Sequence, residues 1–269
     1  MVPTLISRLR TILYEPTVHK VNVDDQELLG IHRSILLGKP LLRSAFVTFY
    51  EEMSRLSDRY LSAGGLEVEL GSGAGFFKSV RPGLISSDVR SGAHIDLAVD
   101  AMNMPMGDAS VRCVYAINVF HHLSNPERFF DELCRVLQPG GGCILVEPHG
   151  GFSSALVHRH LHTDEHFDPD ASNWQTATIG GPLSGANQAL AHIVFRRDQA
   201  RFQELYGKRL EIVSRSYALN SLRYLLSGGL NFRQLLPSAF GPLLQLMERL
   251  GAPLARHWSL HQIIVLRKK

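Results

Sequence analysis

Long apolar runs and cysteine are scarce in this chain of 269 residues. No apolar run is long enough to cross a lipid bilayer as a helix, and the N-terminus lacks the small-residue cleavage site that follows the apolar core of a secretory signal. The three cysteines, Cys113, Cys134 and Cys143, cannot all pair, and two of them lie in apolar stretches. We therefore expect reduced, buried thiols and a cytoplasmic location.

Charge of one sign is not concentrated anywhere in the chain. The net charge is +3 and the basic residues are scattered, so nucleic acid is not expected as a partner. Internal repeats and low-complexity segments do not stand out. With 45% hydrophobic and 20% charged residues, the composition is that of an ordinary globular protein with one large domain or two small ones.

The most informative stretch is residues 66–75, with the sequence LEVELGSGAG. Its apolar residues alternate with two glutamates, which predicts a short strand, and three glycines then follow at every second position. Glycine tolerates a positive φ and has no Cβ, so the backbone can turn tightly and approach a ligand closely. A helix starting at about residues 74–78 would point its free N–H groups at that ligand. The pattern indicates a nucleotide-type cofactor site at the carboxyl end of the first strand of a doubly wound sheet.

Acidic residues follow at the positions where such a site needs them. From residue 66 the chain alternates strand and helix patterns, which is typical of a parallel sheet. The second strand ends at Asp88, close to the distance of about 20 residues at which a carboxylate accepts hydrogen bonds from ribose hydroxyls. The third strand ends at Asp100, and the fifth, predicted over residues 143–146, is followed by His149. These strand ends should meet in one crevice.

The residues before the glycines have helical patterns. Leu5, Ile6, Leu9, Ile12 and Leu13 are spaced as on a short amphipathic helix with arginines between them. We expect this helix to pack on its own domain rather than to serve as a basic anchor on a membrane surface.

Two further helices are predicted before the first strand. Asp24 and Asp25 stand at the expected N-cap of one that ends near Gly38, and a second runs over residues 41–61. We therefore expect a helical N-terminal cap over residues 1–62.

The rest of the chain is expected to form one catalytic domain over residues 63–269. Its insertions lie at about residues 150–207 and 217–257, where both could cover an acceptor pocket.

Several ordered motifs between residues 61 and 148 together resemble the class I S-adenosylmethionine-dependent methyltransferases of the small-molecule branch called type 11. The motifs are VELGSGAG at residues 68–75, Asp88, Asp100-Ala101 followed by MPM at 104–106, NVFHHL at 118–123 and LCRVLQPGG at 133–141. The resemblance implies an α/β, Rossmann-like, doubly wound, mainly parallel seven-stranded sheet, with the helical cap and the helical insertions added to it.

The resemblance also implies the cofactor S-adenosyl-L-methionine and the residues that bind it. The cofactor-binding set it gives is Glu69, Gly71, Ser72, Gly73, Gly75, Asp88, Asp100, Ala101 and Asn118. Within this set, Glu69, Gly71 and Gly73 would hold the methionine part and Asp88 the ribose. Asp100 and Ala101 would contact the adenine edge, and Asn118 would lie near the methionine part.

The first insertion is rich in histidine. His158, His162 and His166 fall at steps of four and would share one face of a helix, the spacing at which histidines can bind zinc. Thr163-Asp164 and Pro169 argue for a loop or a broken helix instead. We expect a lid that contacts the acceptor, and no metal, with plain surface as the other alternative.

The predicted activity is methyl transfer to a hydroxyl, an amine or a carbon of a small or lipid-like molecule or glycan precursor. Histidine has a pKa suited to a general base near neutrality, and His149 is the first candidate and His166 the second. His121 and His122 belong to the family motif and are expected to be structural.

Two alternatives remain. One is a non-catalytic partner protein that binds the cofactor, and the other is an NAD(P)-dependent oxidoreductase. Phe76 in place of the last glycine of the dinucleotide fingerprint disfavours the oxidoreductase. The sequence leaves open the oligomeric state and peripheral contact with a membrane.

Overall fold

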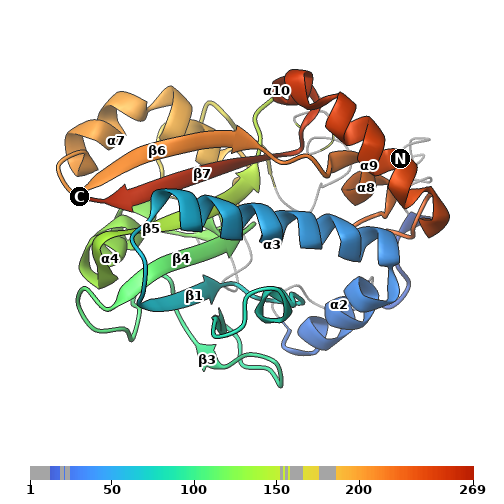
Figure 1. Cartoon of the computed structure of the whole chain (residues 1–269), viewed down its shortest axis with the longest axis horizontal. Helices are drawn as coiled ribbons and strands as arrows, with labels where there is room; N and C mark the ends of the chain where they lie inside the picture. Colours follow the sequence, from blue (N-terminus) through green and yellow to red (C-terminus); the bar gives the residue numbers. More distant parts are fainter. Residues whose placement is uncertain are drawn as a thin grey trace, which may run out of the picture.

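The centre of the molecule is one seven-stranded sheet with strand order β3-β2-β1-β4-β5-β7-β6 (Figure 1). The computed structural model describes residues 13–18, 21, 25–151, 154, 157, 166–175 and 186–269. The strands are β1 (Leu66–Leu70), β2 (Ile85–Asp88), β3 (Leu97–Ala98), β4 (Val111–Ile117), β5 (Leu137–Pro148), β6 (Leu210–Tyr217) and β7 (His261–Lys268). All strands are parallel except β7, which is antiparallel to both β5 and β6. The predicted Rossmann-like, mainly parallel sheet is confirmed.

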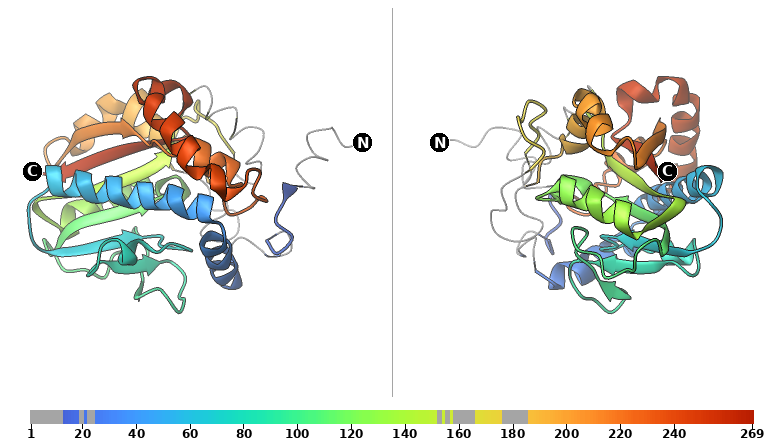
Figure 2. Two further views of the ribbon diagram at one scale, coloured as in Figure 1. Left: turned by 45° about the vertical axis from the view of Figure 1, so that its right-hand side comes forward. Right: turned by 90° about the vertical axis from the view of Figure 1, so that its left-hand side faces the viewer.

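Helices cover both faces of the sheet, as Figures 1 and 2 show. The long α3 (Pro40–Tyr60) crosses one face, and α4 (Pro126–Val136) and α7 (Gln199–Tyr206) cover the other. The remaining helices are α2 (Glu27–Gly38), α6 (Leu190–His192), α8 (Ser221–Leu226), α9 (Gly241–Leu250) and α10 (Ala255–Trp258). Short turns of other helix types lie at Phe77–Ser79, Phe120–His122, Ile193–Arg197, Ser238–Phe240 and Ala252–Leu254.

Two apolar cores lie on the two faces, because successive side chains of a strand point in opposite directions. In β4, Val114 and Ala116 join the core under α4 and α7, whereas Cys113 and Tyr115 join the core under α3. Cys113 and Cys143 are fully buried, and all three cysteines are free thiols. Across the described ranges, helices are too short or too polar to span a bilayer.

The chain after the glycines differs from the prediction. A helix was expected from about residues 74–78, but the structure has only the 3₁₀ turn Phe77–Ser79. Pro82 and Gly83 follow almost at once and redirect the chain into β2, which leaves no length for an α-helix. The space next to the loop is filled by aromatic rings, since Phe77 stacks on Tyr50 of α3 at 4.6 Å between ring centroids.

The start of β5 also differs from the prediction. The fifth strand was predicted over residues 143–146, but β5 begins at Leu137 and includes the glycines at 140–142. A Cβ on Gly142 would stand 2.1 Å from the carbonyl oxygen of Leu266 in β7. The glycine run therefore belongs to the sheet because it lets β7 approach.

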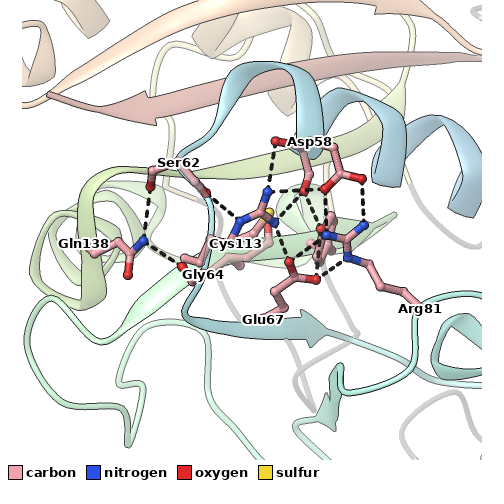
Figure 3. A network of polar contacts seen from close by, with 11 residues as sticks. Asp58, Ser62, Gly64, Glu67, Arg81, Cys113 and Gln138 are labelled. Carbon is pink, nitrogen blue, oxygen red and sulfur yellow. Dashed lines mark hydrogen bonds and ion pairs between the residues drawn. The ribbon is translucent and has the colours of Figure 1, made fainter.

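A polar network ties the edge of the sheet opposite the strand carboxyl ends (Figure 3). Arg112 at the start of β4 is almost fully buried and donates to Glu67 of β1, to the Ser62 carbonyl (2.6 Å) and to Ser57 Oγ (2.8 Å). Arg81 pairs with the same Glu67. Burial alone would raise the pKa of Glu67, but its bonds to the two guanidiniums lower it. This network joins the end of α3 to β1 and β4.

Some predictions concern residues outside this description. Residues 1–12 of the predicted N-terminal helix, His158, His162 and most of the insertion around them lie outside the described residues. The division into a cap of residues 1–62 and a domain of residues 63–269 stays a prediction. The predicted N-cap at Asp24 and Asp25 is wrong in register, because Gln26 occupies the cap of α2 and its side chain makes no cap hydrogen bond.

Candidate functional site

The turn after β1 has the backbone that the glycines predict. Gly71 and Gly73 have φ values of +62° and +48°, a region that residues with a Cβ rarely adopt. A Cβ on Gly71 would lie 2.3 Å from Val119 Cγ2. A Cβ on Gly75 would lie 2.7 Å from both the Ser72 carbonyl oxygen and the hydroxyl of Tyr50. All three positions therefore require glycine.

Glu69 stands directly before this turn with its side chain buried. Its Oε2 accepts a hydrogen bond of 2.8 Å from Ser72 Oγ, and the residue is 3% exposed. Burial, with a further contribution from the charge of Asp88, raises the pKa of Glu69 to about 7. The carboxyl group is thus poised to change its charge when a cationic group approaches.

Asp88, the last residue of β2, contacts the turn from its other side. Its Oδ2 accepts from the Gly73 amide at 3.1 Å, and its Oδ1 accepts from the backbone N–H and the Nε of Arg90 at 3.0 and 3.2 Å. The preceding Ser87 points away, because its hydroxyl donates to the Glu69 carbonyl oxygen at 2.7 Å. The structure therefore brings Glu69 and Asp88 to the same turn.

The other predicted cofactor residues lie at the ends of β3 and β4. Asp100 is exposed and its Oδ1 accepts from the Met102 amide at 2.8 Å, whereas Ala101 is buried in the core. Asn118 follows β4 with a φ of +55°, an uncommon conformation for a residue with a side chain. Its buried Oδ1 has no hydrogen-bond partner among the described residues. A strained residue with an unsatisfied buried oxygen is typical of a ligand site.

A cavity of about 270 Å³ borders the turn, lined by Glu69, Gly75 and residues 93–96. Two side chains that the sequence analysis did not single out for this site contact the turn here. Arg33 of α2 donates to the Gly75 carbonyl oxygen, and His94 Nε2 lies 2.6 Å from the Gly73 carbonyl oxygen. Neither belongs to a motif, so only the fold could reveal them.

Glu147 was also assigned no role in the sequence analysis, although an acidic residue at the end of an apolar strand is a signal of a functional or buried polar position. It is fully buried and accepts from the amides of Val119 and Phe120 at 2.9 and 2.8 Å. Its Oε2 lies 2.6 Å from His121 Nδ1. The contact fixes the turn Phe120–His122 and supports the structural interpretation of His121.

His149 lies where β5 leaves the sheet, beside the first residues of β7 and the last of β6. Its Nε2 is 3.0 Å from the Arg256 carbonyl oxygen, so Nε2 carries a proton and donates it. Its Nδ1 is buried without a partner in the described part of the chain. Burial lowers the pKa of His149, and the nearby Arg196 and His192 lower it further. The ring is therefore neutral at pH 7, with an available lone pair on Nδ1.

His166 is placed differently from His149. It is exposed, and it forms a bridge with Asn187, whose amide donates to the His121 carbonyl oxygen at 3.2 Å. The two predicted bases are thus on different segments, and no contact joins them. Among the described residues there is no group of three or more histidine, cysteine, aspartate or glutamate side chains that could hold a metal ion.

Residues 85–145, from the start of β2 into β5, match the family model of a methyltransferase domain. The segment from β2 into β5 is thus similar to a methyltransferase domain. The matched segment includes Asp88, Asp100 and Asn118, and the glycine turn lies before it, outside the match. The cofactor of such a domain is S-adenosylmethionine.

Known proteins similar to the chain also include methyltransferases. An uncharacterized methyltransferase of Mycobacteroides abscessus is 31% identical over 90 residues, which are 29% of this chain and 35% of the relative. The chain thus spans about a third of the length of the curated relative it matches.

Solved structures are similar at low sequence identity. A chain of the complex between the Haloferax volcanii Trm112 methyltransferase activator and a methyltransferase is 12% identical, with a TM-score of 0.47, over 92% of this chain and 99% of that one. Geranyl diphosphate C-methyltransferase from Streptomyces coelicolor is 11% identical with a TM-score of 0.44, over 81% and 77% of the two chains. The N-methyltransferase NodS from Bradyrhizobium japonicum is 14% identical with a TM-score of 0.43, over 93% of each chain.

The residues at the turn fit S-adenosylmethionine on their own chemistry. Gly71 and Gly73 hold the turn at positive φ, where its backbone amides can face a ligand. Glu69 suits the ammonium group of an amino acid, and Asp88 suits a pair of hydroxyl groups. Asn118 Oδ1 offers an acceptor that lacks a partner in the described structure.

Proposed function

We propose that the protein transfers a methyl group from S-adenosylmethionine to a hydroxyl, an amine or a carbon of a small or lipid-like molecule or glycan precursor. The observation that carries this proposal is the convergence of Glu69 and Asp88 on a turn in which Gly71 and Gly73 have positive φ. When bound, the cofactor supplies an activated methyl group on a sulfonium with a neutral leaving group.

In this proposal the turn residues hold the cofactor. Glu69, Gly71, Ser72 and Gly73 bind its methionine part, with Asn118 nearby. The ribose hydroxyls donate to Asp88, and the adenine lies against Asp100 and Ala101. Positioning of the reacting groups can contribute ~7–11 kcal/mol to lowering the barrier.

We assign the general base to His149, with His166 as the second candidate. The support is that Nε2 of His149 is held by the Arg256 carbonyl oxygen, which leaves the unpartnered Nδ1 as the proton acceptor. In this role His149 Nδ1 would take the proton of the acceptor atom while that atom receives the methyl group that the bound cofactor would supply. A general base of this kind adds typically ~10²–10⁴-fold to the rate.

The first test is calorimetric titration with S-adenosylmethionine, S-adenosylhomocysteine and NADH. We expect micromolar binding of the two adenosyl compounds, loss of that binding in Asp88→Ala, and no change in Asp108→Ala, a matched control at an exposed carboxylate beside Arg135. Binding of NADH alone would overturn the proposal. Once an acceptor is found, His149→Gln should lower kcat while leaving cofactor affinity unchanged.

A further inference from the structure

Among the described residues, most of the large apolar side chains that are exposed belong to one continuous stretch of the chain. Twelve such side chains are exposed there, and seven of them lie within residues 235–254, with 45–74% of their surface accessible. We call these seven the apolar patch: Leu235, Phe240, Leu243, Leu246, Met247, Leu250 and Leu254. Apolar side chains gathered in this way mark an interaction surface.

The apolar stripe of α9 faces solvent instead of the core. Leu243, Leu246, Met247 and Leu250 follow the spacing i, i+3, i+4, i+7 of one helical face, and each is at least half exposed. Helices of a single globular domain turn such a stripe inward, so this orientation is unusual and requires a cause.

The orientation is fixed by a buried ion pair on the opposite face of α9. Glu248 is fully buried, and its carboxylate accepts from Arg223 Nε at 2.7 Å and from the Arg223 backbone amide at 2.9 Å. The same guanidinium donates to the Ser44 carbonyl oxygen (3.0 Å) and to Thr48 Oγ1 (2.9 Å) of α3. The fold thus holds α9 by the face that carries Glu248 and the buried Leu244, and it presents Leu243, Leu246 and Leu250 outward.

The stretch of chain that carries the apolar patch is positively charged. Residues 219–260 contain a single acidic residue, the buried Glu248, whereas Arg233, Arg249 and Arg256 are exposed. None of these three arginines pairs with a carboxylate in the part of the chain that the structure describes.

We propose that the apolar patch docks the protein on an anionic membrane surface. Exposed leucines on a stretch that also exposes three arginines and whose only acid is buried suit lipid tails beneath negatively charged headgroups. A second copy fits less well, because a symmetric contact through this face would bring the arginines of both copies together.

The patch lies on the side of the crevice. Helices α8, α9 and α10 sit at the end of the molecule toward which β1, β4 and β5 point (Figure 1). The carbonyl oxygen of Arg256, in α10, is the partner of His149 Nε2. If the proposed methyl transfer holds, on which this step rests, docking brings a lipid-like acceptor to the crevice from the membrane.

The test is sedimentation with vesicles of phosphatidylcholine, alone or mixed 3:1 with phosphatidylglycerol. We expect binding to the mixed vesicles that weakens with added salt. Leu243→Gln/Leu246→Gln/Leu250→Gln should weaken it at least about tenfold. The matched control Leu37→Gln/Leu97→Gln/Leu205→Gln changes three leucines that are 39–45% exposed outside the patch, and should bind as the wild type does. Arg249→Gln/Arg256→Gln should remove most of the salt dependence.

Other outcomes would overturn this proposal. Absence of binding at low salt, or equal weakening in the patch and control variants, contradicts docking through the apolar patch. A dimer in sedimentation velocity that only the patch variant loses would assign the face to a second copy. Thermal melts show whether each variant is folded. Cofactor titration of the same samples tests the proposed function separately, because it requires no membrane.

Discussion

At the scale of single residues, Glu69 links the fold of the turn to its electrostatics. Its side chain is 3% exposed and shares a hydrogen bond with Ser72, yet no cationic side chain pairs with it in the described structure. Burial therefore dominates its pKa, which is raised to about 7. Two measurable consequences follow from the proton that it holds.

The first consequence is a fall in stability with rising pH. Below about pH 4.5 the carboxyl group is protonated in both states, and between pH 4.5 and 7 only the unfolded chain releases the proton. The free energy of unfolding should fall by about 3 kcal/mol over this window and then level off. Glu69→Gln should lose this component, which urea denaturation at pH 5 and pH 8 measures. Parallel profiles for the two proteins would contradict the raised pKa.

The second consequence is proton release on cofactor binding. An ammonium group beside Glu69 favours the ionised carboxylate, so binding of S-adenosylmethionine at pH 7 should release about half a proton. Calorimetry in two buffers of different ionisation enthalpy measures this number. Glu69→Gln should show none, and the same release in that variant would place the titrating group elsewhere.

Gly71 allows a test of the turn through its backbone conformation. In Gly71→Ala the new Cβ would meet Val119 Cγ2 at 2.3 Å, at a φ of +62°. We expect about 2–4 kcal/mol of destabilisation and loss of cofactor binding, with partial recovery in Gly71→Ala/Val119→Ala. Gly30→Ala is the control, because nothing lies within 4 Å of its new Cβ in helix α2. It should stabilise the protein by up to ~1 kcal/mol, which thermal denaturation can verify.

At the scale of elements, α3, β1 and β4 are held together at the end of the sheet away from the crevice. Glu67 lies between Arg112, which is almost fully buried, and Arg81 (Figure 3). Removing Glu67 is costly, because the nearly buried Arg112 would keep as its anionic partner only the exposed Asp58, at 3.3 Å.

Glu67→Gln should therefore destabilise the protein by about 3–5 kcal/mol. The matched control is Glu52→Gln, which removes the exposed partner of Arg55 in the same helix and should change stability by less than about 1 kcal/mol. Denaturant unfolding compares the two variants. Cofactor affinity, measured where each variant is folded, should remain unchanged, since the network lies at the opposite edge of the sheet.

The elements that the sequence predicted well are those with local signals. Residues 66–70 alternate in polarity, and α3 follows its predicted range of residues 41–61 within one residue at each end. Elements that depend on distant partners were predicted poorly. The glycines at the start of β5 signal a stop in isolation and become part of a strand only because β7 lies against them. The missing helix after Gly75 likewise depends on rings from α3.

The candidate site shows the same division. The positions of Glu69, the glycines, Asp88 and Asn118 around one turn could be predicted from motif spacing, because strand ends share an edge. Arg33 and His94 could not, since they come from a helix and a loop without sequence signals. The environment of His149 depends on Arg256, 107 residues later in the chain.

At the scale of the whole molecule, the crevice and the apolar patch lie toward the same end. Glu248 of α9 pairs with Arg223 in the interior, and the exposed Leu243, Leu246 and Leu250 lie on the other face of the same helix. If both proposals hold, the protein meets a lipid-like acceptor at the membrane surface rather than in bulk water.

The place of β7 in the sheet also determines when the protein can finish folding. β7 is the last strand in the described sequence, but it lies between β5 and β6, and β6 pairs with no other strand. During synthesis, strands up to β5 can pair as they leave the ribosome, whereas β6 must wait more than 40 residues for its neighbour. A nascent chain lacking β7 therefore exposes an unpaired strand edge, and ribosome-bound chains of that length are where chaperone contact should be greatest.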